Sequence, residues 1–150
     1  MPLVIFDSDE TTVQLIRKSL GDAKQIHVFL GNGPTATSAC ALDALWVTAM
    51  QGERFGLSVN LAPGECVIGQ NSPEMVAKGL PRHIVACGTD NHSNWLQVAV
   101  RAVVRTISDF NTKHETSDAI CRVGTIPENL GLTHRNVDSV MTVLKGEWDV

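Results

Sequence analysis

The chain has 150 residues and a formal net charge of -4 at pH 7; 43% of its residues are hydrophobic and 19% are charged. This length suits one compact domain over residues 1–150, and the composition is typical of a globular protein, not a disordered one. A net negative chain without a basic run is not expected to bind nucleic acid through phosphates, and no apolar run reaches the ~20 residues of a membrane span.

In chain order, short apolar runs alternate with helical patterns. We expect strands at 3–6, 26–30, 57–61, 66–68, 84–87 and 119–123, and helices at 13–20, 39–50, 75–79 (one turn), 95–110 and from a cap at Thr133 onward. Strands that alternate with helices predict an α/β fold, namely a three-layer α/β/α sandwich with a mixed, mostly parallel sheet.

The cysteine pattern predicts reduced thiols. The four cysteines lie far apart without a Cys-x-x-Cys pair, apolar residues surround them, and no secretory leader opens the chain. We therefore expect free core thiols and a cytoplasmic location. The five histidines show no metal-ligand spacing, so neither a metal nor a cofactor is predicted.

A glycine-bearing turn follows the predicted strand 26–30. Gly31 and Gly33 allow positive φ and close approach of a ligand to the backbone, and Thr37 or Ser38 is expected to cap the next helix. Such a turn at a helix N-terminus is where α/β proteins bind anionic ligands, although a lone Gly-x-Gly is more often a tight turn alone.

Ligands of parallel sheets bind beyond the carboxyl ends of the strands. We expect three loops, at 31–38, 88–94 and 124–131, to meet at that edge, with Asp9 beside them. The motifs of P-loop ATPases, nicotinamide-dinucleotide enzymes and serine hydrolases are absent from the sequence. A thiol hydrolase that pairs Cys87 or Cys66 with His92 is an alternative, but core cysteines and a surface histidine explain these residues more simply.

Several segments resemble, in the same order, the motifs of one known family. Ser8-Asp9-Glu10-Thr11 is similar to the family's Gly-Asp-Ile-Thr. Val28-Phe-Leu-Gly-Asn32, followed eleven residues later by Asp43-Ala-Leu-Trp, resembles Val-Asn-Ala-Ala-Asn and then Val-Asp-Gly-Ala-Ile. The segments 61–68 and 79–86 resemble its Gly-Glu-Ala turn and Leu-Pro-Ala-Lys-Tyr-Val-Ile-His strand, and 119–125 its Gly-Thr-Gly loop. The family is the macro domain, the ADP-ribose-binding α/β module.

This resemblance implies binding of ADP-ribose or a related adenine nucleotide, with an ADP-ribosylated protein as a further partner. It implies that Asp9 accepts the adenine amino group, that Asn32 places the distal ribose, and that Asp43 acts as a catalytic base. Asp43 falls inside the predicted helix 39–50, where it is either buried with a raised pKa or an ordinary surface charge. The implied ligand-binding residues are Asp9, Glu10, Gly31, Asn32, Gly33, Thr37, Ser38, Gly88, Gly124, Thr125 and Gly131, and the implied catalytic residues are Asn32 and Asp43.

The departures from the family favour binding over removal of ADP-ribose from modified macromolecules. The family's glycines between its asparagine and aspartate are replaced here by residues 34–40, and Glu128 stands where a diphosphate is expected. The alternative from another functional class is a degenerate macro-like interaction or assembly module without catalytic activity. Its supporting features are these altered loops and a carboxyl tail, with Trp148, that is expected to be exposed.

Overall fold

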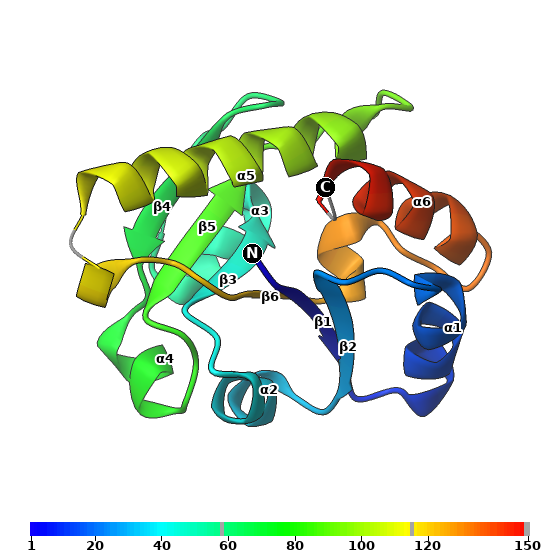
Figure 1. Cartoon of the computed structure of the whole chain (residues 1–150). Helices are drawn as coiled ribbons and strands as arrows, with labels where there is room; N and C mark the ends of the chain where they lie inside the picture. Colours follow the sequence, from blue (N-terminus) through cyan, green and yellow to red (C-terminus); the bar gives the residue numbers. More distant parts are fainter. Residues whose placement is uncertain (58, 115, 149–150) are drawn as a thin grey trace.

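The computed structural model describes residues 1–57, 59–114 and 116–148, in which strands and helices alternate (Figure 1). The strands are β1 (Leu3–Asp7), β2 (Ile26–Leu30), β3 (Ala44–Thr48), β4 (Cys66–Gln70), β5 (His83–Cys87) and β6 (Val123–Thr125). The α-helices are α1 (Glu10–Leu20), α2 (Gly33–Cys40), α3 (Ala49–Gly52), α4 (Pro73–Ala77), α5 (Trp95–Lys113) and α6 (Val137–Glu147), and the 3-10 turns are η1 (Glu53–Phe55), η2 (Thr116–Asp118) and η3 (Pro127–Leu130).

The strands form one mixed sheet in the order β2-β1-β6-β3-β5-β4. All neighbouring strands are parallel except β4, which pairs antiparallel with β5 at one edge. Helices α1, α5 and α6 cover one face, and α2 lies on the other (Figure 1). The predicted three-layer α/β/α sandwich with a mostly parallel sheet is therefore confirmed.

Alternating side chains of the strands supply two cores, because successive residues of a strand face opposite sides of a sheet. Leu3 and Ile5 of β1 face α1, α5 and α6, whereas Val4 and Phe6 face α2. Trp148 is 6% exposed and stacks on Trp46 of β3, with ring centroids 6.1 Å apart. The expectation of an exposed carboxyl-terminal tryptophan was wrong.

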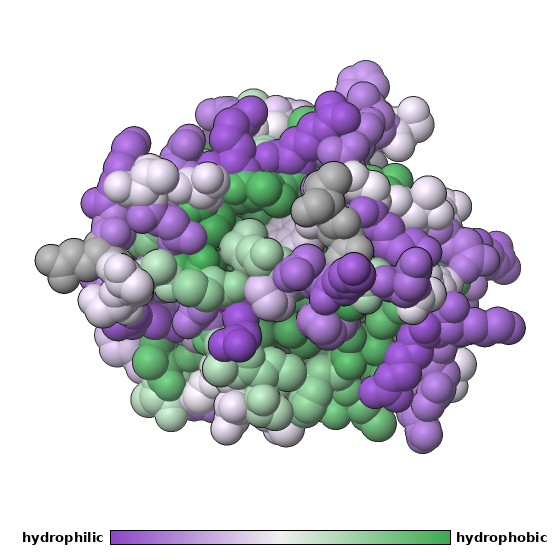
Figure 2. All heavy atoms as spheres, viewed as in Figure 1, coloured by the Kyte–Doolittle hydropathy of each residue, from purple (hydrophilic) through white to green (hydrophobic). Residues whose placement is uncertain are grey.

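The outer surface is polar over the helices. Figure 2 shows hydrophilic side chains over α5 and α1, and a hydrophobic area between α2 and the edge strand β2. Leu30 at the end of β2 is 44% exposed. In the described residues no helix combines the length and the apolar character that crossing a membrane would require.

The predicted helix at 39–50 is wrong. Helix α2 ends at Cys40, Ala41 adopts a left-handed conformation with φ 53°, and Ala44–Thr48 is strand β3 between β6 and β5. Four residues of β3 are buried, since helices or loops cover both faces of the sheet. A continuous apolar run of this kind has no period that separates a strand from a helix, so pairing within the sheet decides its structure.

Smaller corrections concern the other boundaries. The strand predicted at 119–123 begins only at Val123, and the described part of 57–61 is not a strand; Ser58 lies outside the described residues. The last helix begins at Val137, and Thr133 does not cap it. The remaining strands lie within about two residues of their predicted bounds, the usual uncertainty of element ends.

Candidate functional site

A notch opens at the carboxyl edge of the sheet because β6 is short. Its last pairs are Ile5 with Thr125 on the β1 side and Leu45 with Gly124 on the β3 side, whereas β1 runs on to Asp7 and β3 to Thr48. From β2 the chain crosses β1 and β6 to enter β3, so the direction of winding reverses at this point of the sheet. In open α/β sheets, ligands bind in the crevice at such a reversal.

Side chains complete the hydrogen bonding that β6 leaves open. The Thr125 hydroxyl and the Asn129 amide nitrogen each donate to the backbone oxygen of Trp46, at 2.9 Å in both cases. Both side chains are buried, Thr125 at 0% and Asn129 at 3% exposure. They hold η3 against the end of β3 and so fix one wall of the notch.

A cavity of about 220 Å³ lies on the α2 side of the notch, and we name it the apolar slot. Its apolar lining is Phe6, Gly33, Pro34, Leu45, Val47, Phe55, Met75, Leu80 and Ile126. Its polar lining is Gln51, Arg54 and Asn129. A Cβ on Gly33 would lie 2.7 Å from Leu80 Cδ2, so this glycine leaves room that a side chain would take.

A second cavity, of about 310 Å³, adjoins the slot, and we name it the acidic groove. It is lined by Phe6, Asp7, Ser8, Gly31, Asn32, Gly33, Ile126, Pro127 and Glu128. Phe6, Gly33 and Ile126 line both cavities, so slot and groove adjoin, and we name the two together the edge cleft. Its two parts together are in the size range of small-molecule sites.

A chain of side chains links η3 to the turn after β3. Arg54 Nη1 donates to Gln51 Oε1 at 3.1 Å, and Gln51 Nε2 donates to Glu128 Oε1 at 3.3 Å. Arg54 brings a positive charge to the slot, whereas Asp7 and Glu128 bring negative charges to the groove. A ligand of the cleft therefore meets an apolar surface with one cation at one end and carboxylates at the other.

Asn129 has one polar atom without a partner. Its amide nitrogen also reaches Thr125 Oγ1 at 3.3 Å, but its side-chain oxygen is buried with no hydrogen-bond partner among the described residues. An unpaired buried oxygen of this kind costs about 1–3 kcal/mol. Unsatisfied buried groups are rare in folded proteins, so each one calls for an explanation.

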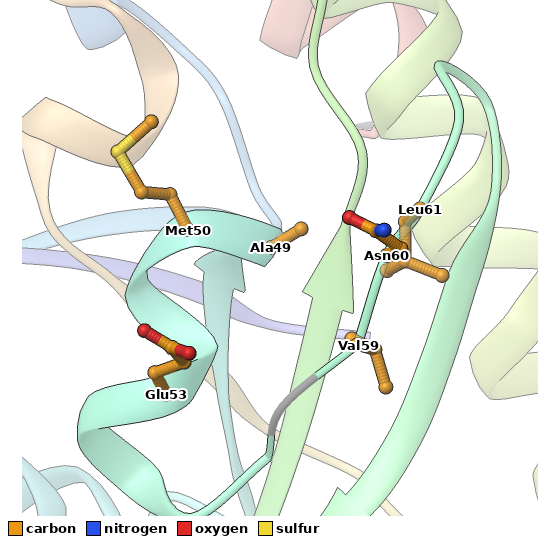
Figure 3. Close-up of a pocket in the computed structure, with 6 residues that line it drawn as sticks. All are labelled: Ala49, Met50, Glu53, Val59, Asn60 and Leu61. Atoms are coloured by element: carbon orange, nitrogen blue, oxygen red, sulfur yellow. The ribbon is translucent and has the colours of Figure 1, made fainter.

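A third hollow, of about 560 Å³, lies on the other side of α3 and η1 (Figure 3). Ala49, Met50 and Glu53 line one side, and the segment 59–61 lines the other. Met50 is 85% exposed. This hollow shares no lining residue with the edge cleft, and we assign it no role.

The structure brings three of the predicted site residues together. Gly31, Asn32 and Gly33 line the acidic groove. Asn32 Oδ1 also accepts from Thr35 N at 2.9 Å and thereby caps α2, a role that was expected for Thr37 or Ser38. The cap position lies upstream of its predicted place because α2 begins six residues earlier than the predicted helix.

Asp9 caps α1 and does not line the cleft. It accepts from Thr12 N at 3.2 Å and from the Thr12 hydroxyl at 2.6 Å, and His134 Nε2 lies 2.9 Å from that hydroxyl. The hydrogen bond from the Thr12 hydroxyl is the main cause that lowers the pKa of Asp9. Glu10 is the first residue of α1, on the helix surface. The structure therefore shows a helix-cap role for Asp9.

Asp43 lies at the amino ends of the parallel strands, whereas Asn32 lies at their carboxyl ends. Asp43 precedes β3, and its carboxylate accepts from the backbone N–H groups of Cys121 at 2.9 Å and Arg122 at 3.0 Å. Asn32 follows β2 at the carboxyl edge. Because β2 and β3 run in the same direction, the two side chains do not meet, and the structure gives no support to a joint catalytic role.

The other predicted ligand contacts have structural roles. Gly124 and Thr125 belong to β6, and a Cβ on Gly124 would lie 2.4 Å from Leu42 Cδ1. Gly88 packs against the segment 61–62, and Gly131 ends η3 with φ 64°. Two further predicted residues, Thr37 and Ser38, lie inside α2. None of these residues lines the edge cleft.

The polar residues of the slot, Gln51, Arg54 and Asn129, were missed from the sequence, and so were Phe6, Asp7 and Phe55. The first two follow β3, which was taken for a helix, so their place at the carboxyl edge was hidden. Asn129 lies in the loop 124–131 that was expected at the site, and an asparagine just after Pro-Glu in this loop was the available signal.

The four cysteines are free, but only Cys87 is buried, so the expectation of four core thiols was partly wrong. Cys87 is opposite Cys66 in the sheet, and its thiol donates to Ala99 O at 3.9 Å, toward α5 and away from the cleft. Hydrogen bonding with Cys87 and burial raise the pKa of Cys66. Within the described ranges, no three His, Cys, Asp or Glu side chains gather closely enough to hold a metal ion.

Comparison with the models of known protein families gives no match for this chain, and comparison with curated protein sequences gives none either.

Proposed function

We propose that the edge cleft binds an adenine nucleotide, with ADP-ribose as the reference ligand. One observation carries the proposal: an apolar slot and a polar groove adjoin at the carboxyl edge of β1, β6 and β3, where the winding of the sheet reverses. The nucleoside part of an adenine nucleotide has the same division into a flat, largely apolar base and a polar ribose.

We assign the base to the apolar slot. The slot contains two aromatic side chains, Phe6 and Phe55, together with aliphatic side chains of β3. Aromatic and aliphatic surfaces of this kind bury the faces of a ring, and the few polar groups around them orient it.

The ribose then lies over the acidic groove. Carboxylates of Asp7 and Glu128 are acceptors for ribose hydroxyls, and the side chain of Asn32 has both donors and acceptors. The same carboxylates repel phosphate, so the phosphate is expected to extend from the ribose out of the groove into solvent. ADP-ribose attached to a protein would present the same nucleotide.

Membership of the macro domain family is part of this proposal. It is supported by the order of the motif-like segments and by an α/β sheet whose candidate binding cleft lies at the carboxyl ends of the strands. We restrict the proposal to binding, because Asn32 and Asp43 lie at opposite ends of the strands. The cytoplasm remains the expected location.

The test is isothermal titration with ADP-ribose, AMP and adenosine. Gly33→Val places a side chain between slot and groove, next to Leu80 Cδ2, and is expected to abolish binding. The matched control is Ser38→Val, because Ser38 is exposed on the same helix and does not line the cleft. Binding by the wild type and the control but not by Gly33→Val would support the proposal.

Absence of heat with all three ligands, from a sample that is folded by circular dichroism, would refute it. That outcome would favour the alternative function, an interaction module whose cleft binds no nucleotide.

A further inference from the structure

We propose that Cys66 and Cys87 are a site of reversible oxidation: a low-molecular-weight disulfide, such as oxidised glutathione, converts their two thiols into one disulfide bond between β4 and β5. The proposal does not rest on the proposed function. Both cysteines lie on the face of the sheet that α5 covers, and neither lines the edge cleft.

The backbone places the two cysteines directly opposite each other. Strands β4 and β5 run antiparallel, and Cys66 is paired with Cys87. The neighbouring pair carries the ladder hydrogen bond, because Gly88 N donates to Glu65 O at 2.9 Å. Cys66 and Cys87 are therefore a non-hydrogen-bonded pair, in which opposite Cα atoms lie ~4.5 Å apart and the side chains come closest. A disulfide needs ~4.4–6.8 Å between its Cα atoms, so this pair meets the requirement without movement of the strands.

The two thiols also contact each other. The Cys66 thiol is hydrogen-bonded with that of Cys87. This hydrogen bond lowers the pKa of Cys87, and together with burial it raises the pKa of Cys66. The sulfur atoms are thus already neighbours in the reduced protein, and a bond between them replaces a contact that exists.

Cys66 is the more accessible of the two cysteines. It begins the edge strand β4 and is partly exposed, whereas Cys87 is 1% exposed. Coupled thiols lose their first proton as a pair, so a shift of the remaining proton along the hydrogen bond brings the negative charge to Cys66. The charge of Arg105 and the hydroxyl of Thr106, both on α5, favour the thiolate at Cys66. We therefore place the first step of the reaction at Cys66.

The reaction consists of two thiol–disulfide exchanges. The Cys66 thiolate attacks one sulfur of the small disulfide, forms a mixed disulfide, and releases one small thiolate. The Cys87 sulfur then loses its proton and attacks Cys66 Sγ, which forms the bond between the strands and releases the second small thiolate. The protein loses two electrons and two protons, and the small disulfide takes them up to become two thiols.

The new bond would clamp the edge of the sheet, because it joins the first residue of β4 to the last residue of β5. It closes a loop of roughly 20 residues and so restricts the unfolded chain. We expect the oxidised protein to unfold at a Tm about 5 °C or more above that of the reduced protein. An unchanged or lower Tm would overturn the clamp.

The experiment treats the folded whole chain with oxidised glutathione, alkylates the remaining thiols in denaturant, and maps the peptides by mass spectrometry. Cys121 is exposed and serves as the internal control, since its conversion to a mixed disulfide shows that the reagent is active. The peptides of Cys66 and Cys87 are expected to be joined. This joined form should be at least tenfold more abundant than Cys66 with glutathione attached, because the second exchange is intramolecular. A reducing agent should restore both thiols.

The variant Cys87→Ser removes the second exchange, so the mixed disulfide at Cys66 is expected to accumulate. If this variant does not fold, the wild-type result still decides. Free thiols at Cys66 and Cys87 after complete reaction of Cys121 would overturn the proposal. A wild-type reaction that stops at the mixed disulfide on Cys66 would overturn it as well.

Discussion

His83 provides the sharpest test of the packing described above. It begins β5, is 3% exposed, and has no hydrogen-bond partner for either ring nitrogen among the described residues. Its ring packs edge-on against Phe110, with centroids 5.4 Å apart. The neutral ring carries one donor and one acceptor, and each unpaired group costs about 1–3 kcal/mol when buried.

Replacement by leucine, an apolar side chain of similar volume but different shape, removes both costs and introduces a modest packing penalty. We therefore expect His83→Leu to raise the free energy of unfolding by about 1–2 kcal/mol. For a chain of this length that corresponds to a rise of about 3–6 °C in Tm. The matched control is His92→Leu in an exposed loop, where a change within about 0.5 kcal/mol is expected.

The same residue predicts a dependence on pH. Burial is the main cause that lowers the pKa of His83 below its ordinary value of 6.5. As the pH falls below 6.5, the unfolded chain takes up the proton before the folded chain does, so the folded state loses stability. Between pH 7.5 and 5.5 one such group lowers the free energy of unfolding by at most about 1.4 kcal/mol.

Urea denaturation of wild type, His83→Leu and His92→Leu at both pH values measures these quantities. The wild type and the control are expected to lose more stability at pH 5.5 than His83→Leu does. A destabilised His83→Leu, or a pH dependence that the substitution leaves unchanged, would show that the ring is hydrogen-bonded in solution and refute the reasoning.

Two further predictions concern residues that were expected at the ligand site. In Gly88→Ala the new Cβ would lie 2.2 Å from Ala62 O, so we expect a loss of about 1–3 kcal/mol in chemical denaturation, whereas Gly146→Ala in α6 meets nothing within 4 Å and should gain about 0.5 kcal/mol. Asp43→Ala removes two hydrogen bonds to residues 121–122 and should cost about 1–2 kcal/mol in the same assay while nucleotide affinity stays unchanged; a selective loss of affinity would instead return Asp43 to the site.

Local patterns predicted much of the fold, because amphipathic period and apolar runs reflect burial directly. Helix α5 and strand β2 were correctly located since the first shows a clear helical period and the second ends at a glycine turn. Strand β3 was not, because its apolar run is buried on both faces and continues into a short helix. That single error hid the turn after β3 and placed Asp43 on a helix.

The candidate site was harder to predict than the fold. Gly31 to Gly33 could be located because a strand end and a helix start are both local features. The roles of Asp9 and Asp43 could not, because a capping carboxylate and a ligand-binding carboxylate are the same residue type, and only their backbone partners separate them. Asn129 is held at the cleft by its hydrogen bond to Trp46. Because Trp46 lies far away in the sequence, no local pattern predicts that Asn129 belongs to the site.

The shortness of β6 also limits which positions can change during evolution. Val123 and Thr125 are 0% exposed, and a Cβ on Gly124 would collide with Leu42, so each position of this strand is held by packing on both faces of the sheet. New ligand preferences would therefore arise first at Glu128, the exposed residue of η3, and at Gln51 and Arg54 in the turn formed by α3 and η1, where side chains reach the cleft without supporting the sheet. Strand β6 is thus constrained by packing, whereas the exposed residues around the edge cleft are free to vary.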